Sequence, residues 1–445
     1  MEFKIYVESL GCDKNLVDTE VMLGRLGKKG CKIVLSPEEA DIAIINTCSF
    51  IHDAKEESVN AILALAEEKK QSDFKIIVTG CLSELYREQI RQEIPEIDGV
   101  LGATNTDRIE ELVESIMEGQ SKEIFDSPDY DAEVFLERIS ESGKYYAFLK
   151  IAEGCDNACT YCIIPKLRGK FRSREIDSLV EEAKYLAKQG KRELILVAQD
   201  VGKYGLDVYG KRSLPELLEK LAAVDGIDWI RLLYVYPEDV TDELIAAMKK
   251  GLALPYLDMP LQHADDFILR RMARKSKVAE LRSLIQKLRR EIPEICLRTT
   301  FITGFPGETA EHFENLHAFV KEVEFDRLGV FTYSKEENTP AAKMKEQVPA
   351  RLKKQRQKTI MLTQQKITFA KNESLVGKTF TVMIDAYLPQ DGVYVGRTYR
   401  DTPDVDGYVF VESRRELLSG DMIPVKIKAV NQYDLIGEEV YEFTE

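Results

Sequence analysis

The sequence predicts an α/β protein in three parts, and three patterns lead to this fold class. Residues 1–120 alternate short apolar runs with helical stretches, which is typical of a doubly wound parallel sheet. A second alternation, over residues 143–372, contains about six strand–helix units and favours a central β/α barrel, complete or incomplete. The remaining residues, 373–445, hold five short runs separated by Gly, Pro and Asp, as in a small five-stranded antiparallel β-barrel of the oligonucleotide-binding shape.

Each part is assigned its elements from the spacing of its apolar residues. In the first part we expect strands at 3–8, 31–35, 41–46, 75–79 and 99–102, with helices that include Val17–Lys28, Glu56–Lys70 and Arg108–Glu118. The stretch 121–142 contains Ser-Pro-Asp-Tyr-Asp and is predicted to be a linker.

The second part repeats this pattern. Strands are predicted at 145–152, 193–198, 230–235, 256–259, 296–302 and 327–332, with helices such as Ser178–Gln189 and Thr241–Lys250. Residues 349–373 form a basic helical segment that we interpret as a solvated connecting helix. Strands of the third part are expected at 379–387, 392–399, 407–412, 422–430 and 434–442.

Composition narrows the class of protein. No stretch of the 445 residues approaches the roughly 20 apolar residues that a membrane span needs. The first residues enter a strand directly without the profile of a signal peptide, which predicts a cytoplasmic protein. The net charge of −15 argues against a general nucleic-acid binder, because phosphate affinity depends on clustered Lys and Arg.

Six of the eight cysteines form two sets of three. Cys155, Cys159 and Cys162 lie within one short run that follows the first predicted strand of the barrel. The other set is spread along the first part, and each member directly follows a predicted strand: Cys12, Cys48 and Cys81. If these strands are parallel neighbours, their carboxyl ends bring the three thiols together.

Each set offers three thiolates, whereas a closed iron–sulfur cluster uses four. A missing ligand leaves an open coordination site, as catalytic metal centres have. Disulfide pairing is disfavoured in a reducing compartment, and a zinc loop or buried free thiols is the alternative for the contiguous set. The other two cysteines, Cys31 and Cys296, lie at strand starts and are assigned to the core.

The contiguous run, with Tyr161 before its last cysteine, resembles the signature of radical S-adenosylmethionine (SAM) enzymes. In that superfamily three thiolates hold a 4Fe–4S cluster whose free iron chelates SAM, and an electron cleaves the sulfonium bond to give a 5′-deoxyadenosyl radical. Further blocks resemble the methylthiotransferases of that superfamily: Ile164–Arg174, Pro260–His263 with Arg274, Thr300–Thr309 and Phe331–Ser334. One loop residue differs from the family pattern: Asn338 stands where these enzymes usually carry Gly.

The resemblance covers the whole chain: a methylthiotransferase N-terminal domain (1–120), a radical SAM core (143–372) and a TRAM domain (373–445). It implies two 4Fe–4S clusters, because Cys12, Cys48 and Cys81 match the ligands of an auxiliary cluster whose open iron is thought to carry the transferred sulfur. The catalytic groups would then be the six cluster ligands alone, with no further catalytic residue.

Six residues are candidates for contact with SAM, on their position after barrel strands or in the matched blocks: Tyr161, Arg168, Arg174, Gln199, Gly304 and Gly307. Arg168 and Arg174 either bind the SAM carboxylate or pair with acidic residues. The two glycines equally suit a tight turn, Asp200 has the same position as Gln199, and His263 is interpreted as structural.

Two branches of this family share the architecture. One modifies an adenosine of tRNA, and the other modifies the β-carbon of an aspartate in the twelfth protein of the small ribosomal subunit. Residues 374–445 hold seven Lys or Arg and thirteen Asp or Glu, which suits a basic protein better than phosphates. The segment Asp401–Gly407 resembles the acidic loop of the protein-modifying branch, as does Tyr234–Pro237, and this branch is the closest match.

The partners that follow are the ribosomal protein, free or in the ribosome, and an external electron donor such as flavodoxin or ferredoxin, with no direct tRNA substrate and no membrane. The tRNA adenosine methylthiotransferase is the alternative. A plain iron–sulfur electron carrier is a third hypothesis, which would need neither a barrel nor a second domain.

Overall fold

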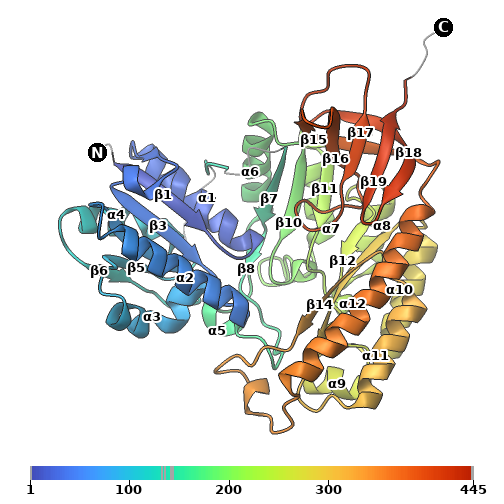
Figure 1. Ribbon diagram of the computed structural model, residues 1–445, viewed down its shortest axis with the longest axis horizontal. Coiled ribbons are helices and arrows are strands. Elements are labelled where there is room, and N and C mark those ends of the chain that lie inside the picture. The colour runs from blue at the N-terminus through green and yellow to red at the C-terminus, as the bar shows by residue number, and fades with distance from the viewer. Residues whose placement is uncertain (1–2, 132–133, 135–136, 141–144, 442–445) are drawn as a thin grey trace.

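The computed structural model describes residues 3–131, 134, 137–140 and 145–441, and it contains the three expected parts (Figure 1). The first sheet is entirely parallel, with the order β2-β1-β3-β4-β5-β6. Its strands are β1 (Lys4–Ser9), β2 (Lys32–Ile33), β3 (Ile42–Thr47), β4 (Lys75–Gly80), β5 (Gly99–Leu101) and β6 (Lys122–Ile124). Its helices are α1 (Asp13–Lys28), α2 (His52–Glu68), α3 (Cys81–Glu93) and α4 (Ile109–Met117).

The central strand β3 shows why this sheet has helices on both faces. All six of its residues are buried, and successive side chains point to opposite faces. Ile42 and Ile44 pack with residues of α1 and α4, whereas Ala43 and Ile45 pack with residues of α2 and α3. The doubly wound arrangement predicted from the sequence is therefore confirmed.

The predicted linker differs from the structure in one element. Residues 122–124 form β6, which pairs with β5 at the edge of the first sheet, so this sheet reaches Ile124. Three residues are too short to show the alternation of a strand, and the neighbouring Gly and Pro dominate the local pattern. Parts of the predicted linker, at 132–133, 135–136 and 141–142, lie outside the described residues.

The second sheet is also parallel and runs in sequence order, β7-β10-β11-β12-β13-β14. Within the described residues β7 and β14 do not pair, so the barrel is incomplete. Its strands are β7 (Tyr146–Lys150), β10 (Glu193–Val197), β11 (Trp229–Leu232), β12 (Tyr256–Asp258), β13 (Cys296–Thr303) and β14 (Arg327–Thr332). A small antiparallel pair, β8 (Ala152–Glu153) and β9 (Arg172–Ser173), stands beside them.

Helices cover the outer face of this half-barrel, and α1 of the first domain covers part of its inner face. The outer helices are α6 (Ile176–Lys188), α7 (Leu214–Ala222), α8 (Asp242–Lys249), α9 (Asp266–Arg271), α10 (Val278–Glu291) and α11 (Ala310–Val323), with the short α5 (Ile164–Arg168) after the cysteine loop. On the inner face, Leu16 and Val17 of α1 pack with Phe148 and Val197. The first domain thus lies against the open side of the half-barrel (Figure 1).

The basic segment 349–373 forms α12 (Ala350–Glu373), which packs along β14 (Figure 1). It is more than a solvated connection, because Arg356, Ile360, Gln364, Thr368 and Asn372 are buried along one side. Four of its other basic residues are exposed: Arg351, Lys354, Lys358 and Lys366. Among the described residues, none of the helices is both long enough and apolar enough to cross a membrane.

The third part is a closed barrel with the order β15-β16-β17-β19-β18. Its strands are β15 (Thr379–Leu388), β16 (Val393–Arg397), β17 (Val409–Glu412), β18 (Met422–Asn431) and β19 (Asp434–Glu439). The expectation of a wholly antiparallel barrel was wrong in one pair, because β17 and β19 are parallel. Directions cannot alternate around a closed ring of five, so at least one neighbouring pair must run the same way.

Candidate functional site: two cysteine triplets at a domain interface

The scattered cysteines converge as the sequence predicted. They follow β1, β3 and β4, which are adjacent parallel strands, so all three lie at the same edge of the sheet. Cys12 precedes α1, and Cys81 begins α3. Gly11 has a φ of +98°, and a Cβ built on it would lie 2.9 Å from Cys48 Sγ. A side chain at position 11 would therefore collide with the neighbouring thiol.

The contiguous cysteines lie in a loop that the core holds from several sides. Cys155 N donates to the Gly169 carbonyl at 3.0 Å, and Thr160 N donates to the Met272 carbonyl at 3.1 Å. Asn157 N lies 3.4 Å from Cys155 Sγ, and Tyr236 Oη lies 3.6 Å from Cys159 Sγ. These contacts fix the loop at the carboxyl-terminal end of the half-barrel, where barrel enzymes have their active sites.

Neither set of cysteines is arranged around a single point. Among the described residues no three His, Cys, Asp or Glu side chains converge closely enough to hold one metal ion. A 4Fe–4S cluster takes each thiolate on a different iron, so its ligands surround a larger body. Burial raises the pKa of the Cys81 and Cys162 thiols to about 12, so their thiolate forms are favoured only beside a positive charge.

Arg168 joins the two sets, and this was not foreseen. Its guanidinium is buried and donates from Nη1 to Asp18 at 2.7 Å and to Glu153 at 2.9 Å. Nη2 donates to Asn15 Oδ1 at 2.8 Å and lies 3.7 Å from Cys81 Sγ. Of the two alternatives for Arg168, these contacts favour pairing with acidic groups over binding the SAM carboxylate.

Other contacts hold the first domain against the core in the same region. Lys150 of β7 pairs with both Asp18 and Glu153. Tyr234 Oη donates to Asp13, the residue after Cys12, at 3.1 Å. The backbone of Tyr234 is left-handed, with a φ of +60°, which costs energy in a residue with a large side chain. The two cysteine sets are therefore fixed relative to each other by buried polar contacts.

Among the remaining SAM candidates, Gln199 and its neighbour Asp200 have buried oxygen atoms without a hydrogen-bond partner. Gln199 lies beside the cysteine loop: its Nε2 donates to Glu153 at 2.9 Å, and its Oε1 is buried without a hydrogen-bond partner. Asp200 also has one buried carboxylate oxygen without such a partner, Oδ1. Burial and the nearby Asp239 raise the pKa of Asp200 to about 7. Such buried polar atoms at the end of a barrel strand fit a polar ligand.

Tyr161 packs edge-on against Phe305 with ring centroids 6.4 Å apart. Arg174 is bound by the chain itself, donating to the Lys150 carbonyl at 3.0 Å and pairing with Glu182 at 2.6 Å. This favours the acidic-pairing alternative for Arg174 as well.

Gly304 and Gly307 occupy positions where the backbone itself favours glycine. Gly304 and Gly307 have positive φ angles, and a Cβ on Gly304 would lie 2.2 Å from the Lys353 side chain. Gly304 N donates to Glu308, whose carboxylate also contacts His263 at 3.2 Å. His263 is thus part of a buried structural network, as interpreted from the sequence.

Sequence reasoning missed two residues beside the contiguous cysteines. Arg274 lies over the ring of Tyr236, 4.0 Å from its centroid, and Tyr236 contacts Cys159. One nitrogen of Arg274, Nη1, is buried without a hydrogen-bond partner. Both residues belong to blocks that resembled the family, but only the fold brings them to the cysteine loop.

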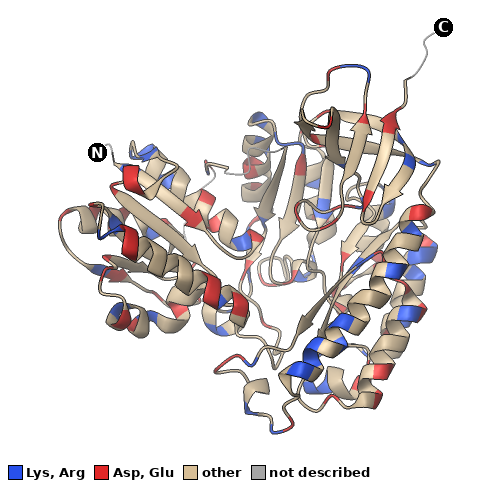
Figure 2. Cartoon of the chain, viewed as in Figure 1, with Lys and Arg blue, Asp and Glu red and all other residues tan. Residues whose placement is uncertain are grey.

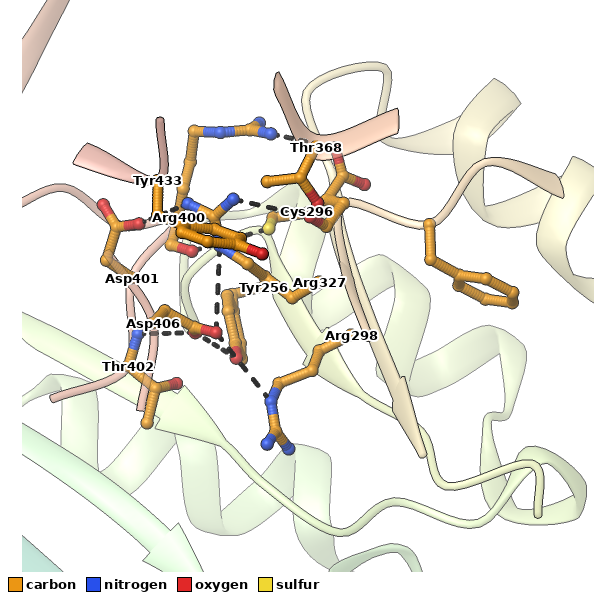
Figure 3. Close-up of polar contacts among 12 residues, drawn as sticks. Tyr256, Cys296, Arg298, Arg327, Thr368, Arg400, Asp401, Thr402, Asp406 and Tyr433 are labelled. Carbon is orange, nitrogen blue, oxygen red and sulfur yellow. Dashed lines mark hydrogen bonds and ion pairs between the residues drawn. The ribbon is translucent and has the colours of Figure 1, made fainter. Parts of the chain in front are cut away.

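The acidic loop 401–407 has a different position from the one expected of a substrate surface. Asp401 accepts from Arg327 at 2.7 Å, and Asp406 accepts from Tyr256 at 2.8 Å (Figure 3). Asp404 accepts from Tyr146 at 2.6 Å. The three carboxylates thus bind the amino-terminal end of the half-barrel, so they do not support a basic protein partner as the sequence argument supposed.

Comparison with known proteins agrees with this three-part description. Residues 4–102 match the model of the Uncharacterized protein family UPF0004, 149–320 match the Radical SAM superfamily, and 376–440 match the TRAM domain. Among solved structures, the radical SAM methyltransferase TsrM from Kitasatospora setae superposes with a TM-score of 0.57 at 14% identity, covering 77% of each chain. The cobalamin-dependent SAM radical enzyme OxsB superposes with a TM-score of 0.53 at 11% identity, covering 81% of this chain and 56% of that one. These structures show the fold alone.

Relatives of known name match nearly the whole chain. "Ribosomal protein uS12 methylthiotransferase RimO" of Lachnoclostridium phytofermentans is 54% identical over 436 residues, covering 98% of this chain and 99% of the relative. The protein of the same name from Clostridioides difficile is 46% identical over 441 residues, covering 99% of each. With this identity over all three domains, the chain belongs to the RimO family of radical SAM methylthiotransferases.

Proposed function

We propose that this protein inserts a methylthio group at the β-carbon of an aspartate in ribosomal protein uS12. The observation that carries this proposal is the full-length identity of 46% to 54% with uS12 methylthiotransferases. The arrangement of the two cysteine sets supports it, because Arg168 links them: it contacts Cys81 of the scattered set and Glu153, which lies two residues before Cys155 of the contiguous set.

Membership in the family establishes iron–sulfur and SAM chemistry for this enzyme. We further propose that Cys155, Cys159 and Cys162 hold the cluster that binds SAM, and that Cys12, Cys48 and Cys81 hold a second 4Fe–4S cluster. When bound, the first would supply the electron for reductive cleavage of SAM and the second the sulfur that is transferred. The convergence of Cys12, Cys48 and Cys81 from three strand ends supports the second site.

The chain's own residues would orient the reactants around these clusters. Tyr161, Gln199, Gly304 and Gly307 are proposed to line the SAM site. The buried, unpartnered oxygen of Gln199 is the strongest support, since a polar ligand would satisfy it. Arg168 and Arg174 serve the proposal differently: their donors already bind acidic side chains, so they hold the site in shape.

We propose domain limits of 1–120, 143–372 and 373–445, with a linker at 121–142. Within this linker, β6 adds an edge strand to the sheet of the first domain. We also propose that the protein works in the cytoplasm, where its ribosomal substrate would be encountered. Its electrons would come from an external donor such as flavodoxin or ferredoxin.

The central test uses the reconstituted enzyme under anaerobic conditions with SAM, a chemical reductant and uS12. Mass spectrometry should detect one methylthio group on an aspartate of uS12. Cys12→Ala should lose iron and abolish thiolation while still forming 5′-deoxyadenosine, because the first cluster site is intact. The contiguous set provides the matched variant, since Cys155→Ala should lose both reactions.

Two outcomes would count against the proposal. Unchanged iron content in Cys12→Ala would remove the second cluster from this site. A methylthio mark on tRNA adenosine, with uS12 unmodified, would assign the chain to the alternative branch.

A further inference from the structure

A basic surface surrounds the cysteine loop, although the whole chain carries a net charge of −15. It is formed by α5, by α9 with the residues up to 275, by residues 335–346 and by the first turns of α12. These segments expose nine cations and three acids. The cations are Lys166, Arg270, Lys275, Lys335, Lys343, Lys345, Arg351, Lys354 and Lys358. Figure 2 shows Lys and Arg gathered at the amino-terminal end of α12.

Direct contacts join these segments to one another. Lys166 Nζ donates to the Asn338 carbonyl at 2.7 Å, which ties α5 to the loop 335–346. Arg271 of α9 pairs with Glu346 at 2.6 Å, so one of the three exposed acids is already neutralised. Lys353 Nζ donates to the Tyr333 carbonyl at 2.7 Å and so fixes the start of α12 beside the same loop.

The same segments cover the cysteine loop. Ala341 N donates to the Thr160 carbonyl at 2.9 Å, between Cys159 and Cys162 in the chain. Met344 packs in one apolar cluster with Tyr161 and Met272. A partner seated on the basic surface would therefore be separated from the cysteine loop by little more than one layer of chain.

We propose that this basic surface docks an acidic, low-potential electron-transfer protein, which delivers electrons to the cluster at Cys155, Cys159 and Cys162. The inference rests on the proposed function, because it requires that cluster. Each reductive cleavage of SAM consumes one electron, which breaks the sulfonium C–S bond, and the donor protein is oxidised by one electron. Electron transfer weakens steeply with distance, so the donor must bind close to the cysteine loop.

Two features suit an electron carrier as the occupant. Clustered charge accelerates a brief encounter without requiring a large buried area, which is what a carrier that must leave again needs. Phe267 of α9 exposes 43% of its surface beside Arg270, and an aromatic residue of this kind is a usual anchor in protein contacts. Ribosomal RNA is also anionic, and the experiment below distinguishes it from an electron carrier.

The test reverses three exposed charges in the reconstituted holoenzyme, in the variant Lys275→Glu/Lys343→Glu/Lys345→Glu. 5′-Deoxyadenosine formation is measured at low ionic strength with reduced flavodoxin and separately with dithionite. We expect the flavodoxin-driven rate to fall about tenfold or more, because steering by charge is lost, while the dithionite-driven rate is unchanged. Added salt should slow the flavodoxin-driven reaction of the unaltered enzyme, so that its rate approaches the rate of the variant.

The matched control is Lys188→Glu/Lys220→Glu/Lys250→Glu, which makes the same charge change at exposed positions in α6 and α7 and directly after α8. It should keep both rates. An equal fall with both reductants would overturn the inference by showing damage to the site itself, and no fall with either would also overturn it. If the variant of the basic surface keeps its flavodoxin-driven rate but no longer modifies the assembled small subunit, the surface binds RNA instead. Failure of the proposed function is separate, since the dithionite reaction itself would then be absent.

Discussion

At the scale of single residues, Arg168 is the group that links the scattered cysteines to the strand before the contiguous ones. It is buried and neutralises Asp18 of the first domain and Glu153 of the core. Burial lowers the pKa of Arg168, whereas the two carboxylates raise it. The carboxylates together have the larger effect, so the pKa of Arg168 is well above its usual range. The charge is therefore permanent, and its loss would leave Asp18 and Glu153 with Lys150 as the one remaining cation that the structure pairs with both.

We expect Arg168→Leu to destabilise the protein by about 3–5 kcal/mol, which is typical when one partner of a buried ion pair is removed. Urea unfolding of the cluster-free protein measures this directly. Lys170→Leu is the control, because Lys170 is exposed two residues away and should change stability by less than about 0.5 kcal/mol. Equal stabilities of the two variants would show that Lys150 alone compensates Asp18 and Glu153.

At the scale of elements, the amino-terminal ends of the barrel strands are closed by the loop between β16 and β17. Asp326, just before β14, connects three elements there: it accepts from Arg400 of the loop at 2.8 Å and from Lys371 of α12 at 3.2 Å, and its other oxygen accepts from Leu297 N at 3.0 Å. Burial opposes the ionisation of Asp326, but Arg400 and Lys371 hold its pKa below the usual value. This carboxylate therefore stabilises the closed end in its charged form.

The depressed pKa of Asp326 fixes the sign of a pH effect. The stabilisation is complete above the unfolded pKa of about 3.9 and is lost as pH falls through the lower folded pKa. Asp326→Asn should therefore be less stable than the unaltered protein at pH 7, and the difference should shrink below about pH 4. Denaturant unfolding across this pH range measures it, with Asp391→Asn, at an exposed turn, as the control. A difference that is constant with pH would contradict the role of the charge.

At the scale of the whole molecule, the TRAM domain is a structural part of the core as well as an appended barrel. Arg397 of the TRAM domain pairs with Glu193 of β10 at 2.7 Å, and Arg231 of β11 donates to the Tyr399 carbonyl at 2.7 Å. All three of these charged side chains are fully or almost fully buried. Without the TRAM domain, Glu193 and Arg231 would meet solvent at the end of the half-barrel.

We expect a protein that ends at Glu373 to melt at least several degrees below the full chain, because it loses these pairs and the apolar contacts around them. Calorimetry of the cluster-free proteins provides the comparison. Arg397→Met in the full chain separates the ion pairs from the domain contact and should give a smaller decrease. An unchanged melting temperature of the shortened protein would show that the core is stable alone.

The pattern of strands and cysteines made much of this protein predictable. Cys12, Cys48 and Cys81 each follow an apolar run, and parallel strands place their carboxyl ends together, so local sequence was sufficient to infer their convergence. The cysteine loop was equally visible in its spacing. The short strand β6 was missed because three residues carry no periodicity, and the parallel pair β17–β19 because it follows from closure of the ring.

The sequence by itself thus determined the three-part fold, the two sets of thiols and the family. Only the tertiary structure decided what the charges do. For Arg168 the sequence left open whether it binds SAM or acidic residues, and the loop 401–407 resembled the acidic loop of the protein-modifying branch. Both are bound by residues of the same chain, such as Asp18 and Arg327, that lie far away in sequence. Periodicity encodes burial and local geometry, whereas the pairing of charges depends on which distant elements meet.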